Sequence, residues 1–336
     1  MEFSLLTLGT ASALPTANRY PSAHILTVRE RLFLIDCGEG TQMQLRRAGI
    51  SFSKIDHIFI SHLHGDHTYG LFGLLSTISM SNRTTPLYIY APEGFKAFLD
   101  FFMSQFGEGV KYPIVHVVVK CSQPTEILRT KQVTVEAFPL VHRTETYGFL
   151  FKEAEPQVNV HKHLIEPKND DTIINNIKNL YQYYDYSEID ENNELVDDLD
   201  YLFVDEDGNI VEYKETLLCK DFTYKPYVPR SFAYCTDTMY FKRLSKWIEN
   251  VDLMYHDSTY TTEFESLAKA NFHSTSAQAA MCAKEANAKK LLLGHFSSRY
   301  KSLDEMLNEA REVFSNTFLA KEGIKFEIPF EKINIR

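Results

Sequence analysis

The chain has 336 residues, of which 44% are hydrophobic, so it can bury one large core or two modest ones, and fibrous and disordered classes are excluded. Five widely spaced cysteines with no Cys-x-x-Cys pair exclude a disulfide framework and a zinc ribbon. The formal net charge of −10 is opposite to the basic footprint of most nucleic-acid enzymes, but residues 153–210 alone carry −13 and the remainder carries +3.

The ends and the apolar segments of the chain bear on its location. The N-terminus lacks a basic segment followed by a long apolar one, and no run of about 18 apolar residues occurs. We therefore expect a cytoplasmic protein that does not enter a membrane.

Strands and helices alternate along the first 140 residues. Apolar, β-rich segments predict strands at residues 3–8, 23–28, 31–35, 58–60, 87–90, 114–120 and 132–139. A segment with one polar and one apolar face predicts a helix at residues 41–48. An apolar segment predicts a second at 70–80, and aromatic residues at a spacing suited to a core predict a third at 92–106. This order favours an α/β fold in which two stacked sheets are flanked by helices.

The pattern His-x-His-x-Asp-His at residues 62–67, directly after a predicted strand, carries the most chemical information. It supplies the nitrogen and oxygen ligands that zinc binds in proteins. His62 and His64 alternate along one extended segment, whereas Asp66 and His67 follow a glycine and turn towards a second position. A polar loop with scattered histidines is the less favoured interpretation. The pattern therefore predicts two adjacent metal ions.

An acidic insert interrupts the alternation at residues 153–225 and leaves 1–152 and 226–336 as the predicted catalytic domain. Within the insert, residues 172–183 have the pattern of one amphipathic helix, and we interpret His161 and His163 as solvated surface. After the insert, strands are predicted at 230–238, 251–259 and 290–293, and helices at 240–250 and 277–286, the last capped by Ser274 or Thr275.

Several predicted strands end in side chains that can bind metal or transfer protons. These are Asp36, His142, Asp237, Asp257 and His295. They can converge only if their strands share one edge of the sandwich. For Asp36, two interpretations have equal weight, an acceptor that orients a metal-bound histidine or an acid stabilised by a helix N-terminus.

These residues together resemble the metallo-β-lactamase superfamily, whose αββα sandwich of two mixed β-sheets carries a dinuclear zinc site. Four further segments are similar to the ribonuclease Z family, which trims the 3′ trailer from tRNA precursors. They are Asp-Cys-Gly-Glu-Gly-Thr-Gln at 36–42, His-Asp-Ser-Thr at 256–259, Phe-His-Ser-Thr at 272–275 and Gly-His-Phe-Ser-Ser-Arg-Tyr at 294–300. The chain departs from the family in two places. The family has Glu where this chain has Asp257. The family also has a basic RNA-gripping arm that contains Gly-Pro, whereas the insert of this chain is acidic and has no Gly-Pro.

The resemblance implies two Zn²⁺ ions per chain, with Mn²⁺ or another divalent ion as an alternative. The implied ligands are His62, His64 and His142 for one ion, Asp66, His67 and His295 for the other, and Asp237 together with a hydroxide as the bridge. The metal-bound hydroxide would attack the phosphodiester and leave a 3′-hydroxyl on the tRNA. Asp66 would accept a proton, and His273, supported by Asp257, would protonate the leaving oxygen.

The same resemblance implies precursor tRNA as substrate and a homodimer, with no DNA partner. We expect Arg299 and Arg19 to contact substrate phosphates, with Arg46 and Arg47 as weaker candidates and pairing to surface carboxylates as the alternative. The acidic insert is expected to face solvent or another chain rather than grip RNA. An alternative function is hydrolysis of a small phosphodiester, ester or lactone. A non-catalytic binding protein is a third possibility, which the complete set of ligand residues disfavours.

Overall fold

The computed structural model describes residues 1–157, 159–160, 201–204, 210–213 and 223–332. Residues Met1–Ala154 and Pro229–Phe330 form one compact unit, and residues Glu155–Val228 and Glu331–Arg336 form a second. The predicted helix at 172–183 and the two histidines of the insert, His161 and His163, lie outside the described residues. No helix in the described ranges is long and apolar enough to cross a membrane.

The described parts of the second unit contain two small antiparallel sheets. Their strands are β10 (Asn159–Val160) with β13 (Thr223–Tyr224), and β11 (Tyr201–Val204) with β12 (Ile210–Tyr213).

The first unit contains two sheets of seven strands each. The first sheet has the order β18-β1-β2-β3-β4-β5-β6, in which β18 to β3 pair antiparallel and β3 to β6 pair parallel. Its strands are β1 (Phe3–Gly9), β2 (Ala23–Val28), β3 (Arg31–Cys37), β4 (Ile55–Phe59), β5 (Leu87–Pro92), β6 (Ile114–Val119) and β18 (Lys325–Glu327).

The second sheet has the order β17-β16-β15-β14-β9-β8-β7. Its first four strands pair parallel and the rest antiparallel, so both sheets are mixed. Its strands are β7 (Thr125–Arg129), β8 (Val133–Pro139), β9 (Tyr147–Glu153), β14 (Ser231–Cys235), β15 (Leu253–Asp257), β16 (Leu291–Gly294) and β17 (Thr317–Leu319).

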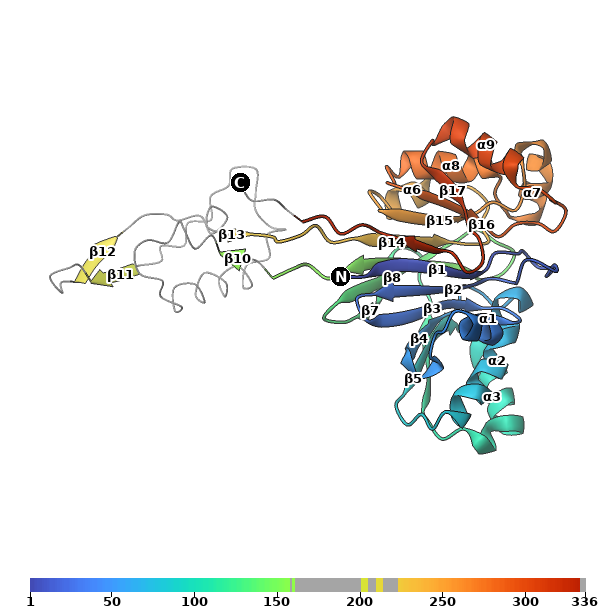
Figure 1. The fold of residues 1–336 in the computed structure, drawn as a ribbon, viewed down its shortest axis with the longest axis horizontal. Coiled ribbons are helices and arrows are strands. Elements are labelled where there is room, and N and C mark those ends of the chain that lie inside the picture. Colours follow the sequence, from blue (N-terminus) through green and yellow to red (C-terminus); the bar gives the residue numbers. More distant parts are fainter. Residues whose placement is uncertain (158, 161–200, 205–209, 214–222, 333–336) are drawn as a thin grey trace. The chain divides into compact units, whose positions relative to one another are not determined.

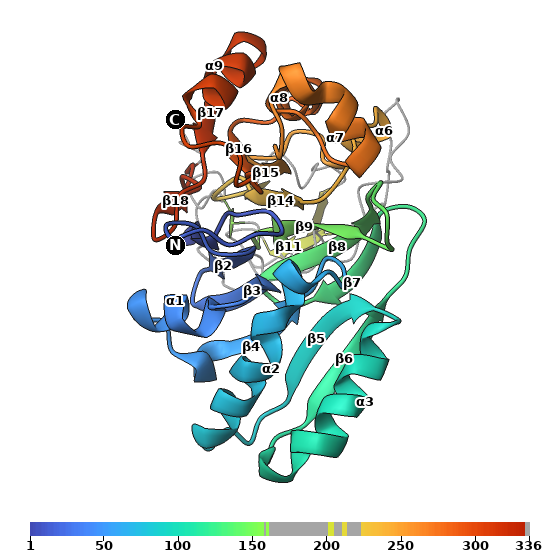
Figure 2. The same ribbon diagram turned by 90° about the vertical axis from the view of Figure 1, so that its right-hand side faces the viewer.

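Helices cover the outer faces of the two stacked sheets, which gives the predicted αββα sandwich (Figures 1 and 2). The helices beside the first sheet are α1 (Thr41–Arg47), α2 (Gly65–Met80) and α3 (Phe95–Phe106). Those beside the second are α6 (Arg243–Trp247), α7 (Glu265–Asn271), α8 (Ser276–Glu285) and α9 (Asp304–Val313). The fold class expected from the sequence is therefore confirmed.

Aromatic side chains fill the space between the two sheets. Phe59 of β4 lies 5.3 Å from Phe149 and 5.2 Å from Phe151 of β9, measured between ring centroids. Phe33 of β3 lies 5.7 Å from Phe151, and all of these rings are fully buried. Edge-to-face aromatic pairs each add about 0.5–1.5 kcal/mol beyond their buried area. The packing holds the two sheets together, so their strand ends have fixed relative positions.

The start of α2 differs from the sequence prediction. The helix begins at Gly65 rather than at residue 70, so Asp66 and His67 lie in its first turn. The carbonyl of His64 accepts hydrogen bonds from the His67 amide at 3.1 Å and from the Thr68 hydroxyl at 2.9 Å. An acidic residue in the first turn is also favoured by the helix dipole. The polar ligand residues hide the helical pattern in the sequence.

Thr275, rather than Ser274, caps helix α8. Its hydroxyl accepts the Gln278 amide at 3.2 Å, and the Gln278 side chain accepts the Thr275 amide at 3.1 Å, which completes a capping box. The Ser274 hydroxyl instead donates to the Thr238 carbonyl at 2.6 Å. The cap fixes the segment that carries His273 just before the helix.

A buried ion pair joins β9 to the start of β14. Arg230 donates through Nε and Nη2 to the two carboxylate oxygens of Glu153, both at 2.8 Å, and through Nη1 to the Ile328 carbonyl at 2.8 Å. Both charged side chains are buried. Removing one partner of such a pair leaves an uncompensated charge and usually costs about 3–5 kcal/mol.

We expect Arg230→Met to lower the free energy of unfolding by about 3 kcal/mol, the low end of that range, because Arg29 remains 3.7 Å from Glu153. Thermal unfolding should show a melting temperature lower by roughly 6–12 °C. Lys120→Met, which breaks the exposed pair with Glu93, is the matched control and should change stability by less than about 1 kcal/mol. Equal shifts for the two variants would contradict a structural role of the buried pair.

Candidate metal centre

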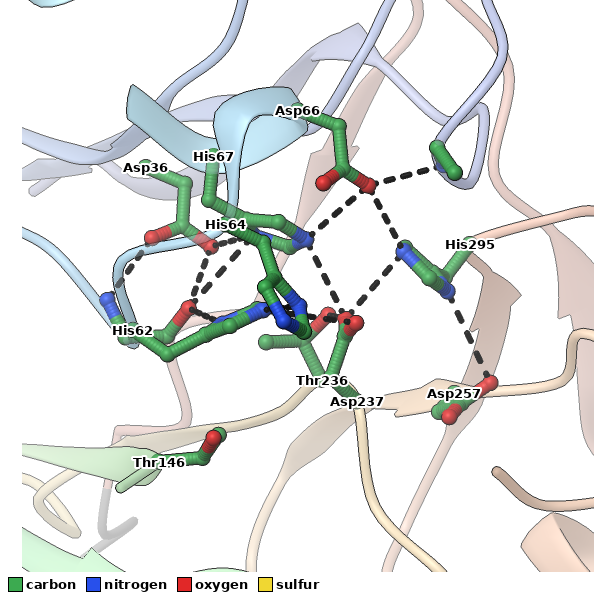
Figure 3. Close-up of polar contacts among 12 residues, drawn as sticks. Asp36, His62, His64, Asp66, His67, Thr146, Thr236, Asp237, Asp257 and His295 are labelled. Carbon is green, nitrogen blue, oxygen red and sulfur yellow. Dashed lines mark hydrogen bonds and ion pairs between the residues drawn. The ribbon is translucent and has the colours of Figure 1, made fainter. Parts of the chain in front are cut away.

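Parallel strands bring the candidate residues to one edge of the sandwich. Figure 3 shows how His62, His64, Asp66, His67, Asp237 and His295 point towards one another. In the second sheet, β14, β15 and β16 are parallel neighbours, so Asp237, Asp257 and His295 stand at the same end. In the first sheet, β3 and β4 are also parallel, which places Asp36 beside the segment 62–67. The sandwich thus gathers polar side chains from segments far apart in the chain.

The first cluster consists of His62, His64, His142 and Asp237, whose ligand atoms lie within 4.8 Å of one another. His62 Nε2 lies 2.9 Å from His64 Nδ1, which lies 3.3 Å from His142 Nε2. Asp237 Oδ2 stands 3.6 Å from His62 Nε2 and 3.7 Å from His142 Nε2. Three imidazole nitrogens and one carboxylate oxygen therefore face a common point.

The second cluster consists of Asp66, His67 and His295. The Nε2 atoms of both histidines lie 3.5 Å from Asp66 Oδ2. Asp237 contributes here as well, because its Oδ1 lies 3.2 Å from His67 Nε2 and 3.1 Å from His295 Nε2. One oxygen of Asp237 thus faces each cluster, which is the arrangement of a bridging carboxylate.

The residues present fit a metal-binding site. Among the described residues, the buried Nε2 atoms of His67 and His295 make no hydrogen bond, although carboxylate oxygens stand close by. Buried polar atoms are otherwise nearly always paired, so these two require a partner. Histidine nitrogens and aspartate oxygens are the ligands of zinc and similar cations. The cluster can therefore bind metal.

The pKa shifts of the clustered side chains also support metal binding. Burial lowers the pKa of His62 well below its usual value. Burial also opposes protonation of His67 and His295, but nearby carboxylates outweigh it. Asp237 and Asp66 raise the pKa of His67 well above its usual value, and Asp237 raises that of His295 to about 10. The site therefore favours positive charge, and metal binding would displace these protons.

Asp36 orients one of the candidate ligands. Its carboxylate is fully buried, accepts the Nδ1–H of His67 at 2.7 Å and the Tyr234 hydroxyl at 2.7 Å, and accepts the Ser61 amide at 2.8 Å. With Nδ1 held in this way, Nε2 of His67 turns towards the second cluster. Helix α1 has no acidic residue in its first turn, so the contacts support the metal-orienting interpretation over the helix-capping one.

We expect Asp36→Asn to weaken metal binding by roughly 10- to 100-fold, because the amide is a poorer acceptor for the His67 proton. Asparagine tolerates the positive φ of 55° at this position, so the fold should persist. Competition with a chromophoric chelator measures the affinity, and thermal unfolding checks the fold. A folded variant with unchanged metal affinity would show that Asp36 has no part in metal binding.

Three residues of the centre have left-handed backbone conformations. The φ angles are 55° for Asp36, 43° for Asp237 and 59° for His295, and each residue lies at or just past a strand end. Such conformations are uncommon outside glycine and cluster at functional sites. The turn at each position redirects a side chain from the sheet edge into the centre. These left-handed conformations could hardly be predicted from the amino-acid types at the three positions.

A histidine–aspartate pair lies beside the two clusters of candidate ligands. His273 Nδ1 lies 2.7 Å from Asp257 Oδ2, and the other oxygen of Asp257 accepts the Thr259 hydroxyl at 2.6 Å. The His273 ring lies 5.0 Å from the His142 ring and 5.3 Å from the His295 ring. It faces a cleft of about 310 Å³ whose lining includes residues of both ligand clusters, among them His64, His142, Asp66 and His295. Within the described residues, Nε2 of His273 makes no hydrogen bond, so it is available for proton transfer.

The predicted phosphate contacts lie around the cleft rather than in its lining. Arg299 stacks over Tyr260 at 5.3 Å and over Phe264 at 4.7 Å. Arg19 lies 5.6 Å from the Phe296 ring and donates to the Tyr300 carbonyl at 3.4 Å. Neither arginine lines the cleft, which is lined instead by Arg143, a residue that the sequence analysis did not single out.

The two weaker candidates pack against aromatic rings of their own neighbourhood. Arg46 lies 5.0 Å from the Phe52 ring, and Arg47 donates to the Tyr20 hydroxyl at 2.7 Å. Neither of them lines the cleft.

Comparisons with known proteins agree with this geometry. Residues 227–296 match the family model described as beta-lactamase superfamily domain, and residues 3–159 match the model of the anti-Pycsar protein Apyc1. The chain is 37% identical to a ribonuclease Z of Phocaeicola vulgatus, over 97% of this chain and 98% of the relative. It is 35% identical to a ribonuclease Z of Porphyromonas gingivalis, over 97% and 99% of the two chains.

Solved structures show the same architecture. The crystal structure of the short form of human tRNase Z is similar with a TM-score of 0.64 and 26% identity, over 97% of this chain and 99% of that one. The metallo-beta-lactamase fold protein YhfI of Bacillus subtilis also has a TM-score of 0.64, at 18% identity, over 97% and 100% of the chains, and supports the fold alone.

The fold and the His/Asp cluster define a metal-dependent hydrolase of the metallo-β-lactamase superfamily. Extended identity to curated relatives along nearly the whole chain places it more narrowly. The chain belongs to the ribonuclease Z family.

Proposed function

We propose that this chain is an endoribonuclease that removes the 3′ trailer from precursor tRNA and leaves a 3′-hydroxyl on the tRNA. The observation that carries the proposal is that the metal-binding cluster and the His273–Asp257 pair face one cleft. The relatives named ribonuclease Z and the human tRNase Z structure support this choice of substrate.

The metal set in this proposal is two Zn²⁺ ions per chain, with Mn²⁺ as the alternative. His62, His64 and His142 would hold one ion, Asp66, His67 and His295 the other, and Asp237 would contact both. Bound cations of this kind activate water and neutralise charge that develops on a phosphodiester.

The side chains themselves would position and move protons. Asp66 is the proposed proton acceptor, because it lines the cleft, and His67 and His295 lower its pKa although burial opposes this, so that the carboxylate is ionised. The Ala13 amide donates to its Oδ2 at 2.8 Å and orients the carboxylate. His273 is the proposed donor to the leaving 3′-oxygen, since Asp257 holds its Nδ1 and leaves the other nitrogen free. A strongly basic leaving group makes such a donor valuable.

We further infer a cytoplasmic homodimer that acts on RNA and not on DNA or membranes, in line with the ribonuclease Z family. The catalytic domain would comprise residues 1–152 and 226–336. Because residues 153–210 carry −13, the insert at 153–225 is proposed not to attract tRNA phosphate, so precursor binding would rely on the remaining chain, which carries +3.

A comparison of kcat/KM between substrates tests the proposal against its alternative, hydrolysis of a small phosphodiester, ester or lactone. Purified protein is incubated with a 3′-extended tRNA precursor, and separately with cyclic nucleotide, bis(p-nitrophenyl) phosphate, ester and lactone substrates, with and without a chelator. We expect kcat/KM to be highest on the precursor and to be lost with the chelator. A higher kcat/KM on the cyclic nucleotide, the ester or the lactone than on the precursor would favour the alternative.

A further inference from the structure

Arg143 is the cationic side chain closest in sequence to a candidate metal ligand, because it follows His142 directly. It is exposed and lines the cleft that holds the metal clusters and His273. Its Nη2 donates to the Asn271 side-chain oxygen at 2.6 Å and to the Ala270 carbonyl at 3.3 Å. The guanidinium is therefore fixed at the wall of the cleft by neutral acceptors.

The remaining donors of Arg143 are available to a ligand. Within the described residues, no carboxylate lies within 4.0 Å of this guanidinium, and its Nε and Nη1 make no hydrogen bond. Most other arginines of the centre's surroundings stack on aromatic rings, as Arg299 does over Tyr260. Hydrogen bonds from a guanidinium to a phosphate oxygen are charge-assisted, so the free N–H groups favour a phosphate ligand. Arg143 thus presents an uncompensated positive charge and free N–H donors at the wall of the cleft.

The end of helix α7 fixes the side of the cleft on which Arg143 lies. Phe272, the residue after the helix, has a φ of 58°, and its carbonyl accepts the Nδ1–H of His142 at 3.1 Å. Asn271 binds Arg143 and also donates to the Tyr260 hydroxyl at 3.0 Å, and His273 follows two residues later. Residues 271–273 therefore place the candidate ligand His142, the proposed proton donor His273 and Arg143 close to one another.

We propose that Arg143 binds the phosphate immediately 5′ of the nucleotide whose 3′-oxygen leaves. This inference rests on the proposed function. His273 would protonate the leaving 3′-oxygen, so the nucleotide that carries this oxygen lies on the His273 side of the cleft. The next negative charge on that side is the 5′-phosphate of the same nucleotide. Arg143 would therefore fix the tRNA end of the cleavage site, whereas the metal centre fixes the scissile phosphate.

The test removes the charge from each partner in turn. Arg143→Ala should lower kcat/KM on the precursor by roughly 10- to 100-fold, the usual effect of losing a charged hydrogen bond. A precursor with a methylphosphonate at the phosphate 5′ of the leaving nucleotide should lower wild-type kcat/KM to a similar extent. With that substrate, Arg143→Ala should cause little further loss, because the two changes remove the same contact.

Matched controls separate this contact from other effects. A methylphosphonate two linkages into the trailer should affect wild type and Arg143→Ala equally. Arg129→Ala, which removes an exposed arginine paired with Glu126, should leave all rates at the wild-type level. Arg143→Lys should recover part of the loss, because it keeps the charge but not the planar guanidinium that Asn271 and Ala270 hold. A full penalty for Arg143→Ala on the methylphosphonate precursor, or no penalty on the unmodified one, would overturn the proposal.

A second measurement does not depend on precursor cleavage. A trinucleotide with a free 3′-hydroxyl resembles the product end and should inhibit hydrolysis of bis(p-nitrophenyl) phosphate. Its inhibition constant should rise roughly 10- to 100-fold in Arg143→Ala, but not when its last linkage is a methylphosphonate. Equal inhibition of both proteins would refute the Arg143 subsite. A wild type that hydrolyses the small substrate but not the precursor would instead refute the proposed function.

Discussion

Replacing Asp237 with asparagine is expected to lower precursor cleavage by at least roughly 10³-fold and to reduce bound metal from about two ions per chain to one or none. The two oxygens of Asp237 face different clusters, Oδ2 lying 3.6 Å from His62 Nε2 and Oδ1 lying 3.1 Å from His295 Nε2. An amide has a single oxygen and no charge, so it cannot serve both clusters. Asparagine also tolerates the positive φ of 43°, so the backbone should keep its course.

Elemental analysis after metal reconstitution, together with precursor cleavage rates, measures this effect. Asp252→Asn is the matched control, because Asp252 precedes β15 at the opposite end from the centre and accepts the Ser231 amide at 2.7 Å. It should keep both ions and full activity. An Asp237→Asn protein with two ions and normal rates would contradict the bridging role, and fewer than one ion in the reconstituted wild type would contradict the dinuclear assignment.

His273→Ala is expected to slow precursor cleavage by roughly 10²- to 10⁴-fold, the range of a lost general acid. The loss on bis(p-nitrophenyl) phosphate should be much smaller, because nitrophenolate leaves without a proton. Our proposal makes His273 a proton donor and not a ligand, so metal content should not change. The measurement is needed because a ring nitrogen of His273 lies within 4.8 Å of ligand atoms of Asp237 and His295. Single-turnover rates on both substrates separate the chemical step from binding.

His116→Ala provides the comparison for this variant. His116 is a partly buried histidine whose Nε2 lies 3.1 Å from the Ala91 carbonyl, away from the cleft lining. Its loss should affect both substrates equally and only slightly. If His273→Ala lost the same factor on the precursor and on the nitrophenyl substrate, His273 would act through structure or binding rather than as a proton donor.

Much of the candidate centre could be predicted from sequence because its ligands are concentrated. The segment 62–67 places four candidate ligand residues after one strand. Asp237, Asp257 and His295 each follow or end an apolar strand, which marks a sheet edge. Apolar strands and alanine-rich helices are recognisable from local pattern alone. The αββα layers followed from the order of those elements.

Other features depend on three-dimensional packing that residue identity does not encode. The left-handed backbones of Asp237 and His295 and the early start of α2 at Gly65 arise from the turns that hold the centre. Arg143 looks like any surface arginine in the sequence. The position on which its proposed role depends is visible only in the structure, where Asn271, at the end of a helix that was not predicted, holds it at the wall of the cleft.

The most direct test of the account is the origin of the oxygen in the cleaved phosphate. The purified protein is incubated with a 3′-extended tRNA precursor in ¹⁸O-water, and both product ends are analysed by mass spectrometry, with and without a chelator. Hydrolysis by activated water predicts a 3′-hydroxyl on the tRNA, one ¹⁸O in the 5′-phosphate of the trailer, and no products when metal is removed. A 2′,3′-cyclic phosphate on the tRNA, a trailer without ¹⁸O, or undiminished cleavage in the chelator would contradict the account.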